Sequence, residues 1–274
     1  MEKLNIIRIN SLSEERLAVY TSLSENQIKH IYEPEQGLFI AESPVVIERA
    51  LDAGYEPESV LTDNSHIKEI MELFNEKYAG AGLDIYLADD SVLDKIKGFE
   101  MTRGALCAFK RKQLANIQDV CRGVTRIAVM EEVQNPTNVG AIFRSAAAMG
   151  IEAVLLTSGC ADPLYRRAVR VSMGNVFLVP WTIAEADRNI AGELKKLGFT
   201  TLAMALKDNT VSIDNPVLKK CERLAIFLGT ESEGLMDSTI EACDYTVKIP
   251  MREGVDSLNV AAASAVAFWE LGKK

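Results

Sequence analysis

The residues best suited to chemistry gather in three polar loops, each of which follows an apolar run typical of a β-strand. The loops are EEVQNPTNVGAIFR (131–144), LGTESEGL (228–235) and IPMREGVDSLN (249–259). They offer amides, carboxylates, a hydroxyl and a guanidinium, which are groups that orient a ligand or stabilise charge. In open α/β sheets, ligands bind outside the carboxyl ends of the strands. We therefore expect these loops to lie at the ligand-binding edge of a sheet.

The first loop combines Asn138 with Arg144, which lies six positions further along a predicted helix. Asn138 is placed to cap that helix by accepting a backbone hydrogen bond. An arginine in an otherwise apolar helix usually extends its charged head to water. A guanidinium also binds phosphate through two parallel hydrogen bonds. Taken alone, the loop leaves a structural and a phosphate-binding role open.

The second loop places Gly229, Glu231 and Gly234 in a tight glycine turn that carries a carboxylate. Glycine lets a backbone approach a ligand closely, although an ordinary strand-to-helix turn has the same pattern. The spacing matches neither the GxGxxG fingerprint of dinucleotide-binding folds nor the GxxxxGKS/T phosphate loop. The loop therefore argues against the common nucleotide-binding folds.

The third loop leads through Ser257 and Asn259 into an alanine-rich helix. Two polar residues at the start of a buried helix contribute little to packing, so we expect both to face a ligand. An N-cap role for Ser257 is the structural alternative, and the two roles are compatible.

The apolar runs that lead into these loops predict a mostly parallel sheet with helices on both faces. Strands are expected over 125–133, 152–157, 175–181, 200–206 and 223–229, and a helix over 138–150.

The first third of the chain predicts a smaller α/β sandwich. Its expected elements are strands over 37–41, 59–63, 84–88 and 104–110, and helices within 13–32 and over 43–54 and 67–78. Residues 111–123 lack a clear period and are the expected linker. Charge also divides the chain, because residues 1–100 hold nine basic and 20 acidic residues, whereas the remainder carries a formal charge of +2. We therefore predict two domains, residues 1–115 and 116–274.

Composition narrows the class of protein. The 274 residues include no apolar run near the ~18 residues that cross a membrane, and the first residues form no apolar signal core. Five cysteines without a CxxC pair favour reduced thiols in a cytoplasmic protein. The two histidines, His30 and His66, lie far apart, which argues against a His-based catalytic pair or metal site.

In combination, the three loops resemble the motifs of the SpoU (TrmH-like) branch of the SPOUT RNA methyltransferases. The first motif is matched by NPTNVGAIFRSAAAMG, the second by FLGTESEGL and the third by IPMREGVDSLNVAAASAVAFWE, in order over roughly 124–274. The motif residues are Asn138, Arg144, Glu231, Ser257, Leu258 and Asn259. The first third is similar to the small ribosomal-protein-like sandwich that binds substrate in these enzymes. The usual Glu-Gly at its strand-to-helix turn is Glu42-Ser43 here.

The resemblance implies a knotted fold and a methyl-transfer reaction. In this family the C-terminal segment threads through a loop to form a deep trefoil knot, and S-adenosylmethionine binds in the knot. Transferred by motif position, the cofactor contacts are Leu228, Gly229, Ile249 and Leu258. The implied reaction methylates a ribose 2′-hydroxyl of RNA and needs no metal. The family also implies a homodimer in which each active site borrows from its neighbour, with the apolar helix over 258–270 as a plausible interface or, equally simply, a core helix.

Arg144 is the central catalytic residue that the resemblance implies, with a proposed role in activating the 2′-hydroxyl. Arginine holds its proton very tightly, so we prefer a clamp on the adjacent phosphate that also stabilises the emerging alkoxide. The other four residues, which would position the ribose and support Arg144, are Asn138, Glu231, Ser257 and Asn259.

Two other functions stay open at this stage: a SPOUT methyltransferase that acts on a base, and a non-catalytic RNA-binding protein. Ribosomal RNA is favoured over transfer RNA as the partner, because an added sandwich domain suits a structured target. Phosphate binding needs local cationic surface rather than a basic protein overall. The predicted RNA-binding residues are Arg103, Lys110, Arg111, Arg166, Arg167 and Arg170, with a solvated basic face as the alternative.

Overall fold

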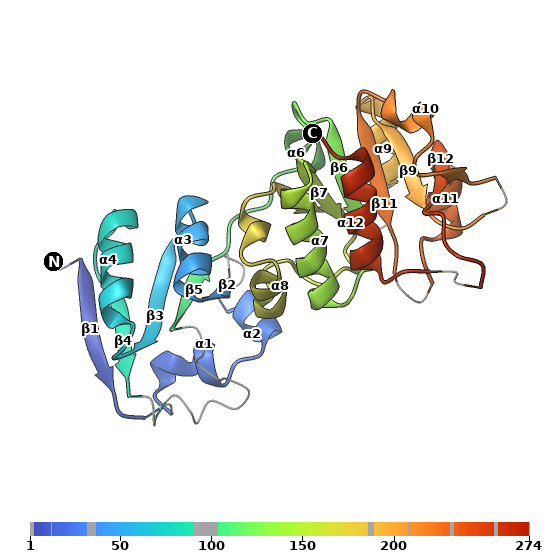
Figure 1. Cartoon of the computed structure of the whole chain (residues 1–274). Helices are drawn as coiled ribbons and strands as arrows, with labels where there is room; N and C mark the ends of the chain where they lie inside the picture. Colours follow the sequence, from blue (N-terminus) through green and yellow to red (C-terminus); the bar gives the residue numbers. More distant parts are fainter. Residues whose placement is uncertain are drawn as a thin grey trace. The chain divides into compact units, whose positions relative to one another are not determined.

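The computed structural model describes residues 3–11, 13–31, 37–89, 92, 104–185, 189–207, 209–230, 233–254 and 257–273 (Figure 1). Contacts divide the chain into two compact units. The first contains the residues up to Gln113 together with Leu164–Phe177, and the second contains Leu114–Pro163 together with Leu178–Lys274. The sequence-based domain prediction places Leu164–Phe177 in the second domain, whereas in the structure this segment packs with the first unit.

Polar contacts explain why Leu164–Phe177 belongs to the first unit. Arg49 Nη1 donates hydrogen bonds to the Met173 carbonyl and to Asn175 Oδ1, both at 2.6 Å. These partners lie more than 120 residues from Arg49 in the chain. The local sequence therefore gives no sign of where the segment packs.

An apolar contact corrects one predicted strand. The Phe177 ring lies 5.6 Å from the Phe39 ring and 5.3 Å from the Tyr55 ring, measured between centroids. The apolar run that starts at residue 175 therefore serves this cluster, where Asn175–Phe177 forms the 3-10 turn η2. The predicted strand over 175–181 is wrong for most of its length, because strand β8 (Trp181–Ile183) begins at its last residue.

The first unit is built on a five-stranded sheet in the order β1-β4-β3-β5-β2. Strands β1, β4 and β3 are parallel, and β5 is antiparallel to both β3 and β2. The strands are β1 (Leu4–Ile9), β2 (Leu38–Glu42), β3 (Pro57–Asp63), β4 (Leu83–Ala88) and β5 (Ala105–Lys110). The four strands expected in this region are present, and β1 is a fifth that the sequence analysis did not predict.

Helices cover both faces of this sheet. Because side chains alternate between faces along a strand, Leu38 and Ile40 join the cluster that holds Leu17, Tyr20 and Ile28. The intervening Phe39 stacks on Phe109 on the other face. The helices are η1 (Glu15–Leu17), α1 (Ala18–Thr21), α2 (Glu25–Lys29), α3 (Pro44–Asp52), α4 (Ile67–Lys77) and, from the returning segment, α8 (Arg166–Val171).

The turn between β2 and α3 is strained. Ser43 has φ of 86° and ψ of 149°, a region that is essentially reserved for glycine. This explains in physical terms why a Glu-Gly pair suits the turn, and why Glu42-Ser43 departs from it at a conformational cost.

The second unit is a seven-stranded, fully parallel sheet in the order β10-β12-β9-β11-β6-β7-β8. Its other strands are β6 (Arg126–Met130), β7 (Ala153–Leu156), β9 (Thr200–Met204), β10 (Val211–Ser212), β11 (Leu224–Leu228) and β12 (Tyr245–Lys248). Every residue of β11 is buried, as expected for a central strand with helices on both faces. The predicted α/β class is confirmed, and the trefoil knot stays a prediction.

The helices of this unit separate onto two faces (Figure 1). One apolar cluster joins α6 (Ile117–Val120), α9 (Ile190–Lys196) and α11 (Asp237–Ala242) to one face of the sheet. On the other face, α7 (Pro136–Ala148) and α12 (Val260–Leu271) pack against each other, and α12 also packs on β11. The short α10 (Pro216–Lys219) precedes β11. None of the helices in the described ranges is long and apolar enough to cross a membrane.

Candidate active site

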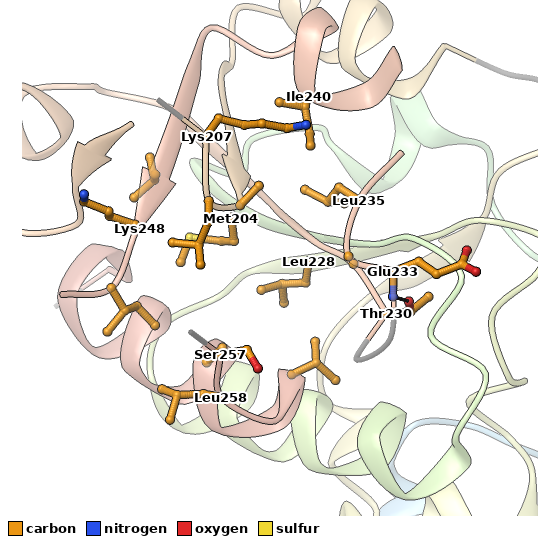
Figure 2. Close-up of a pocket in the computed structure, with 18 of the residues that line it drawn as sticks. Met204, Lys207, Leu228, Thr230, Glu233, Leu235, Ile240, Lys248, Ser257 and Leu258 are labelled. Carbon is orange, nitrogen blue, oxygen red and sulfur yellow. Dashed lines mark hydrogen bonds between the residues drawn. The ribbon is translucent and has the colours of Figure 1, made fainter. Parts of the chain in front are cut away.

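Two of the three polar loops line one cavity of about 450 Å³ at the carboxyl edge of the parallel sheet (Figure 2). Its walls come from the ends of β9, β11 and β12 and from the residues before α12, so we call it the β9–β12 cavity. All four predicted cofactor contacts line it, as does one predicted catalytic residue: Leu228, Gly229, Ile249, Leu258 and Ser257. The structure thus brings together residues that are up to 30 positions apart in the sequence.

The β9–β12 cavity has an apolar floor and a polar rim. Leu228 and Leu235 are buried, and with Met204 they form part of the floor (Figure 2). At the rim, Lys207 Nζ lies 2.7 Å from Asp237 Oδ1. Such a cavity suits a ligand with a flat apolar part and charged ends.

Gly229 is required by the loop itself. A Cβ atom at this position would lie 2.2 Å from the carbonyl carbon of Gly234 and 2.3 Å from the nitrogen of Leu235. These atoms belong to a narrow turn closed by two 3.1 Å backbone hydrogen bonds between Thr230 and Gly234. The glycine therefore permits a close approach of two backbone segments of the same loop. Glu231, inside this turn, lies outside the described residues.

A second cavity of about 400 Å³ adjoins the first. It lies between the end of β6 and the start of α7, and we call it the β6–α7 cavity. Three residues line both cavities: Thr230, Glu233 and Val260. A ligand in one cavity and a ligand in the other would therefore both contact these three residues, which we call the common wall.

Asn138 and Asn259 meet beside the common wall. The buried Asn138 accepts a hydrogen bond on Oδ1 from Nδ2 of Asn259 at 3.4 Å. Asn259 also caps α12, because its Oδ1 accepts from the Ala261 nitrogen at 2.9 Å. The pair fixes the first turns of α7 and α12 against each other, directly beside Val260.

Two predicted helix caps need correction. The N-cap of α7 is Asn135, whose Oδ1 accepts from the Thr137 nitrogen at 2.9 Å, so Asn138 lies inside the helix. The N-cap of α12 is Asn259 and not Ser257. Both observed caps are asparagines, which cap a helix as well as serine does. Which of two neighbouring polar residues is the cap can be decided only from the backbone geometry.

Arg144 does not join the residues described so far. It lies on the exposed face of α7 and lines neither cavity. Six residues of α-helix separate Arg144 from Asn138 by about 240° around the axis. Within the described chain, the Arg144 side chain forms no hydrogen bond or ion pair.

The predicted RNA-binding residues differ in their surroundings. Arg103 lies outside the described residues. Lys110 forms ion pairs with Glu56 and Glu58 at 2.7 and 3.7 Å, and Arg111 is half-buried. These pairs reduce the cationic surface that the sequence suggests for this stretch.

The arginines of α8 lie next to a buried carboxylate. Nε and Nη2 of Arg166 each lie 3.3 Å from Glu42 Oε2, and Nη1 of Arg170 lies 3.9 Å from the same oxygen. The Glu42 side chain is 5% exposed, and burial lowers the pKa of Arg166 although Glu42 opposes this. Arg167 is exposed. Arg166 therefore has a structural partner 124 residues away, which a search for nearby acids could not find.

Several polar residues of the two cavities escaped the sequence analysis, among them Thr230, Glu233 and Lys207. Thr230 and Glu233 lie inside the second motif, and their position in that loop was a sufficient signal. Lys207 follows strand β9, where the rule that ligands bind beyond strand ends applies equally. In the described part of the chain, no three His, Cys, Asp or Glu residues form a group that could hold a metal ion.

Comparisons with known proteins find relatives along most of the chain. An uncharacterised tRNA/rRNA methyltransferase of Mycobacterium bovis is 38% identical, over 86% of this chain and 81% of that protein. The 23S rRNA (guanosine-2′-O-)-methyltransferase RlmB of Bordetella pertussis is 27% identical, over 82% of this chain and 92% of its own length. A crystal structure of an AdoMet-bound rRNA methyltransferase from Sinorhizobium meliloti has a TM-score of 0.79 over 97% of each chain. At 21% identity, that similarity establishes the fold.

A family model extends over the parallel sheet and all three motif loops. The model of the SpoU rRNA Methylase family matches residues 125–269, which is more than half of the chain. This match confirms the resemblance drawn from the motifs, together with the predicted class of enzyme. The chain belongs to the SpoU rRNA methylase family.

Proposed function

We propose that the chain methylates the 2′-hydroxyl of a ribose in ribosomal RNA, with S-adenosylmethionine as the methyl donor. The observation that carries the proposal is the pair of adjoining cavities, which residues of the three motif loops line between them. The family supplies the reaction, and a relative that modifies ribose 2′-oxygens of 23S rRNA supplies the substrate class. The reaction takes place in the cytoplasm, where this RNA is found.

The β9–β12 cavity fits the cofactor. Its volume of about 450 Å³ lies within the ~300–1,000 Å³ range of small-ligand sites. The apolar floor at Leu228 and Leu235 suits the adenine ring, and the polar rim suits the charged amino-acid end. We assign Gly229, Ile249 and Leu258 to cofactor binding as well. When bound, S-adenosylmethionine supplies a methyl group made electrophilic by its sulfonium, so the chain needs no covalent nucleophile.

The β6–α7 cavity is the substrate side of the common wall. Asn138 and Asn259 keep that wall rigid, because each amide joins the start of α7 to the start of α12. A rigid wall would hold the 2′-oxygen in line with the methyl group. Such positioning lowers the barrier of a reaction between two bound molecules. Neither amide takes up a proton. Their role, like the one we assign to Ser257 and Glu231, is to orient the ribose.

Arg144 needs a second chain to reach a cavity. We assign the chain to a homodimer that pairs through α7 and α12. Ala262, Val266 and Trp269 recur every third or fourth position and form an exposed apolar stripe on α12, and the Trp269 side chain is 66% exposed. Arg144 is exposed on the helix packed beside it. In a symmetric pair the same face meets itself, so each Arg144 would approach the partner's cavities and clamp an RNA phosphate there.

The first unit would supply further contacts to RNA. It carries the sandwich expected for substrate binding, and its exposed Arg167 is the residue of α8 that we assign to phosphate contact. The first unit, which includes Leu164–Phe177, would thus act as the RNA-binding domain.

Transfer of labelled methyl groups tests the proposed function. The protein is incubated with labelled S-adenosylmethionine and ribosomal RNA, and the RNA is digested to nucleosides. Label on the ribose of one nucleotide is the expected result. Label on a base, or no label in RNA from cells that lack the gene, would contradict the proposal.

A further inference from the structure

We infer that the β6–α7 cavity is a pocket for the target base, and that Glu233 selects guanine in it. This inference rests on the proposed function, because it assigns the base whose ribose is methylated. The name of the RlmB relative gives guanosine as its target, and the inference adds the residue that would select this base here.

The position of the cavity makes it the place for a base. It adjoins the cofactor cavity across the wall formed by Thr230, Glu233 and Val260. A ribose whose 2′-oxygen is held at that wall must place its base to one side. Enzymes that do chemistry on a base extrude it into a pocket and recognise its Watson–Crick edge there, and a base beside a ribose held at the wall can be recognised through the same edge. A volume of about 400 Å³ accommodates one base with part of its sugar.

The lining that this chain supplies favours a neutral group over a phosphate. No lysine or arginine is among the described residues that line the β6–α7 cavity, and two of them, Glu132 and Glu233, are carboxylates. Carboxylates accept hydrogen bonds and repel anions. The cavity is therefore suited to a neutral group that presents hydrogen-bond donors.

The two carboxylates differ in what they already bind. Glu132 Oε1 accepts a hydrogen bond from Thr157 Oγ1 at 2.9 Å, and the same carboxylate lies so close to Gly159 that a Cβ there would meet it at 1.9 Å. Glu233 is exposed, and its carboxylate has no hydrogen bond or ion pair within the described parts of the chain. Its backbone nitrogen donates to Thr230 Oγ1 at 3.0 Å, which orients the residue. In Figure 2 the Glu233 carboxylate points away from the apolar floor of the cofactor cavity.

Guanine is the base that matches this set of groups. Its N1–H and N2–H are adjacent parallel donors, which a carboxylate accepts with both oxygens. Adenine and cytosine place a ring acceptor beside their amino group, and uracil has a single N–H between two carbonyls, so each would leave one Glu233 oxygen facing an acceptor.

Asn135 offers the complementary donor. Because its Oδ1 is committed to capping α7, its Nδ2 remains available to donate, and the O6 of guanine is an acceptor on the same edge. A carboxylate and an amide on one cavity thus match all three polar groups of that edge.

A substitution that exchanges one acceptor for a donor tests this assignment. Glu233→Gln keeps the shape of the side chain but presents one donor and one acceptor, the pattern that matches adenine. The matched control is Glu241→Gln, which removes an exposed carboxylate on α11 that lines neither cavity.

The substrates are RNA fragments around the mapped nucleotide that differ only in the target base: guanine, adenine, cytosine, uracil or hypoxanthine. Wild-type protein should prefer guanine over adenine by roughly 5- to 150-fold, as a two-hydrogen-bond contact discriminates, with hypoxanthine between them. Glu233→Gln should lose that preference and gain on adenine, with all rates measured at saturating S-adenosylmethionine because Glu233 also lines the cofactor cavity. Glu241→Gln should behave like wild type.

Equal rates on all bases, or a Glu233→Gln protein that keeps the guanine preference or loses all substrates equally, would overturn the inference. Titration of guanosine and adenosine monophosphates, followed by NMR, separates it from the proposed function. If no RNA is methylated, preferential binding of guanosine monophosphate that Glu233→Gln abolishes still supports the pocket. Equal binding of the two nucleotides would refute it.

Discussion

The arginines of α7 and α8 have opposite surroundings. Arg166 of α8 lies within the first unit against the buried carboxylate of Glu42, and its charge is balanced inside the chain. Arg144 of α7 is exposed and has no ion-pair partner among the described residues. A charge that the fold already balances contributes to stability, whereas a charge that the fold leaves unbalanced remains available to a ligand or to another chain. The predictions below test this distinction.

The largest expected effect is on catalysis. Arg144→Ala should reduce the rate of methyl transfer at least ~100-fold, the size seen when a group that stabilises a developing oxyanion is removed. Stability should change by less than about 0.5 kcal/mol, because the side chain is exposed. Single-turnover methylation and urea unfolding measure the two effects. Lys196→Ala, which removes an exposed cation from α9, is the control, and a near wild-type rate for Arg144→Ala would refute its catalytic role.

For Arg166 on α8 we expect a large loss of stability. Arg166→Ala leaves the Glu42 carboxylate buried, with Arg170, 3.9 Å away, as its remaining cation among the described residues. Breaking such a pair destabilises a fold by about 3 kcal/mol, so urea unfolding should shift markedly. Arg167→Ala, one position along the same helix, should have little effect on unfolding. If the two variants were equally stable, Arg166 would not be a structural residue.

The stability of the second unit should depend on pH through Glu152, a carboxylate that is paired within the fold. Burial alone raises the pKa of Glu152, but hydrogen bonds from Lys273 and Thr125 lower it from 4.5 to about 2. A carboxylate with a lowered pKa stabilises the fold above its unfolded pKa, and this contribution is lost as the pH falls from about 4.5 towards about 2. Glu152→Gln should flatten that part of the stability curve. If the variant lost stability in acid as the wild type does, the hydrogen bonds from Lys273 and Thr125 would not stabilise the fold through Glu152.

The smallest effect concerns RNA affinity. Arg167→Ala should weaken binding to all RNA sequences alike and lower the slope of log affinity against log salt by roughly 0.7 to 0.9 unit, as one lost phosphate contact does. Filter binding at several salt concentrations measures the slope. Lys68→Ala in the acidic first third is the comparison, since Lys68 lies 3.9 Å from Glu72 in an exposed pair. Equal losses from both variants would remove Arg167 from the RNA-binding surface.

The gathering of the predicted cofactor contacts in one cavity could be anticipated from the sequence, because the resemblance assigns them by motif position and the motifs follow strands. Leu228 ends strand β11, Ile249 follows β12 and Leu258 precedes α12. The carboxyl ends of parallel strands lie at one edge of the sheet, where ligands bind. Motif spacing then places them in one cavity. The strand order, which determines that β11 lies between β9 and β6, was not predictable, because parallel pairing leaves no local pattern.

The errors arose where the deciding partner is distant or where neighbours compete. The Arg166–Glu42 pair spans 124 positions, so the α8 arginines looked uniformly free. Phe177 completes an apolar strand pattern, yet packs against Phe39 of another sheet. Asn135 and Asn138 can both cap a helix, and only the backbone geometry shows which of the two begins α7.

The central claim is that Arg144 of one chain completes the active site of its partner. Mixed dimers test it most directly, with Arg144→Ala in one subunit and Ala205→Phe, which fills the cofactor cavity, in the other. Each variant alone should be inactive, whereas the mixed dimer should regain activity, because the intact cavity of the first subunit receives Arg144 from the second. An inactive mixed dimer of two folded subunits would contradict the account.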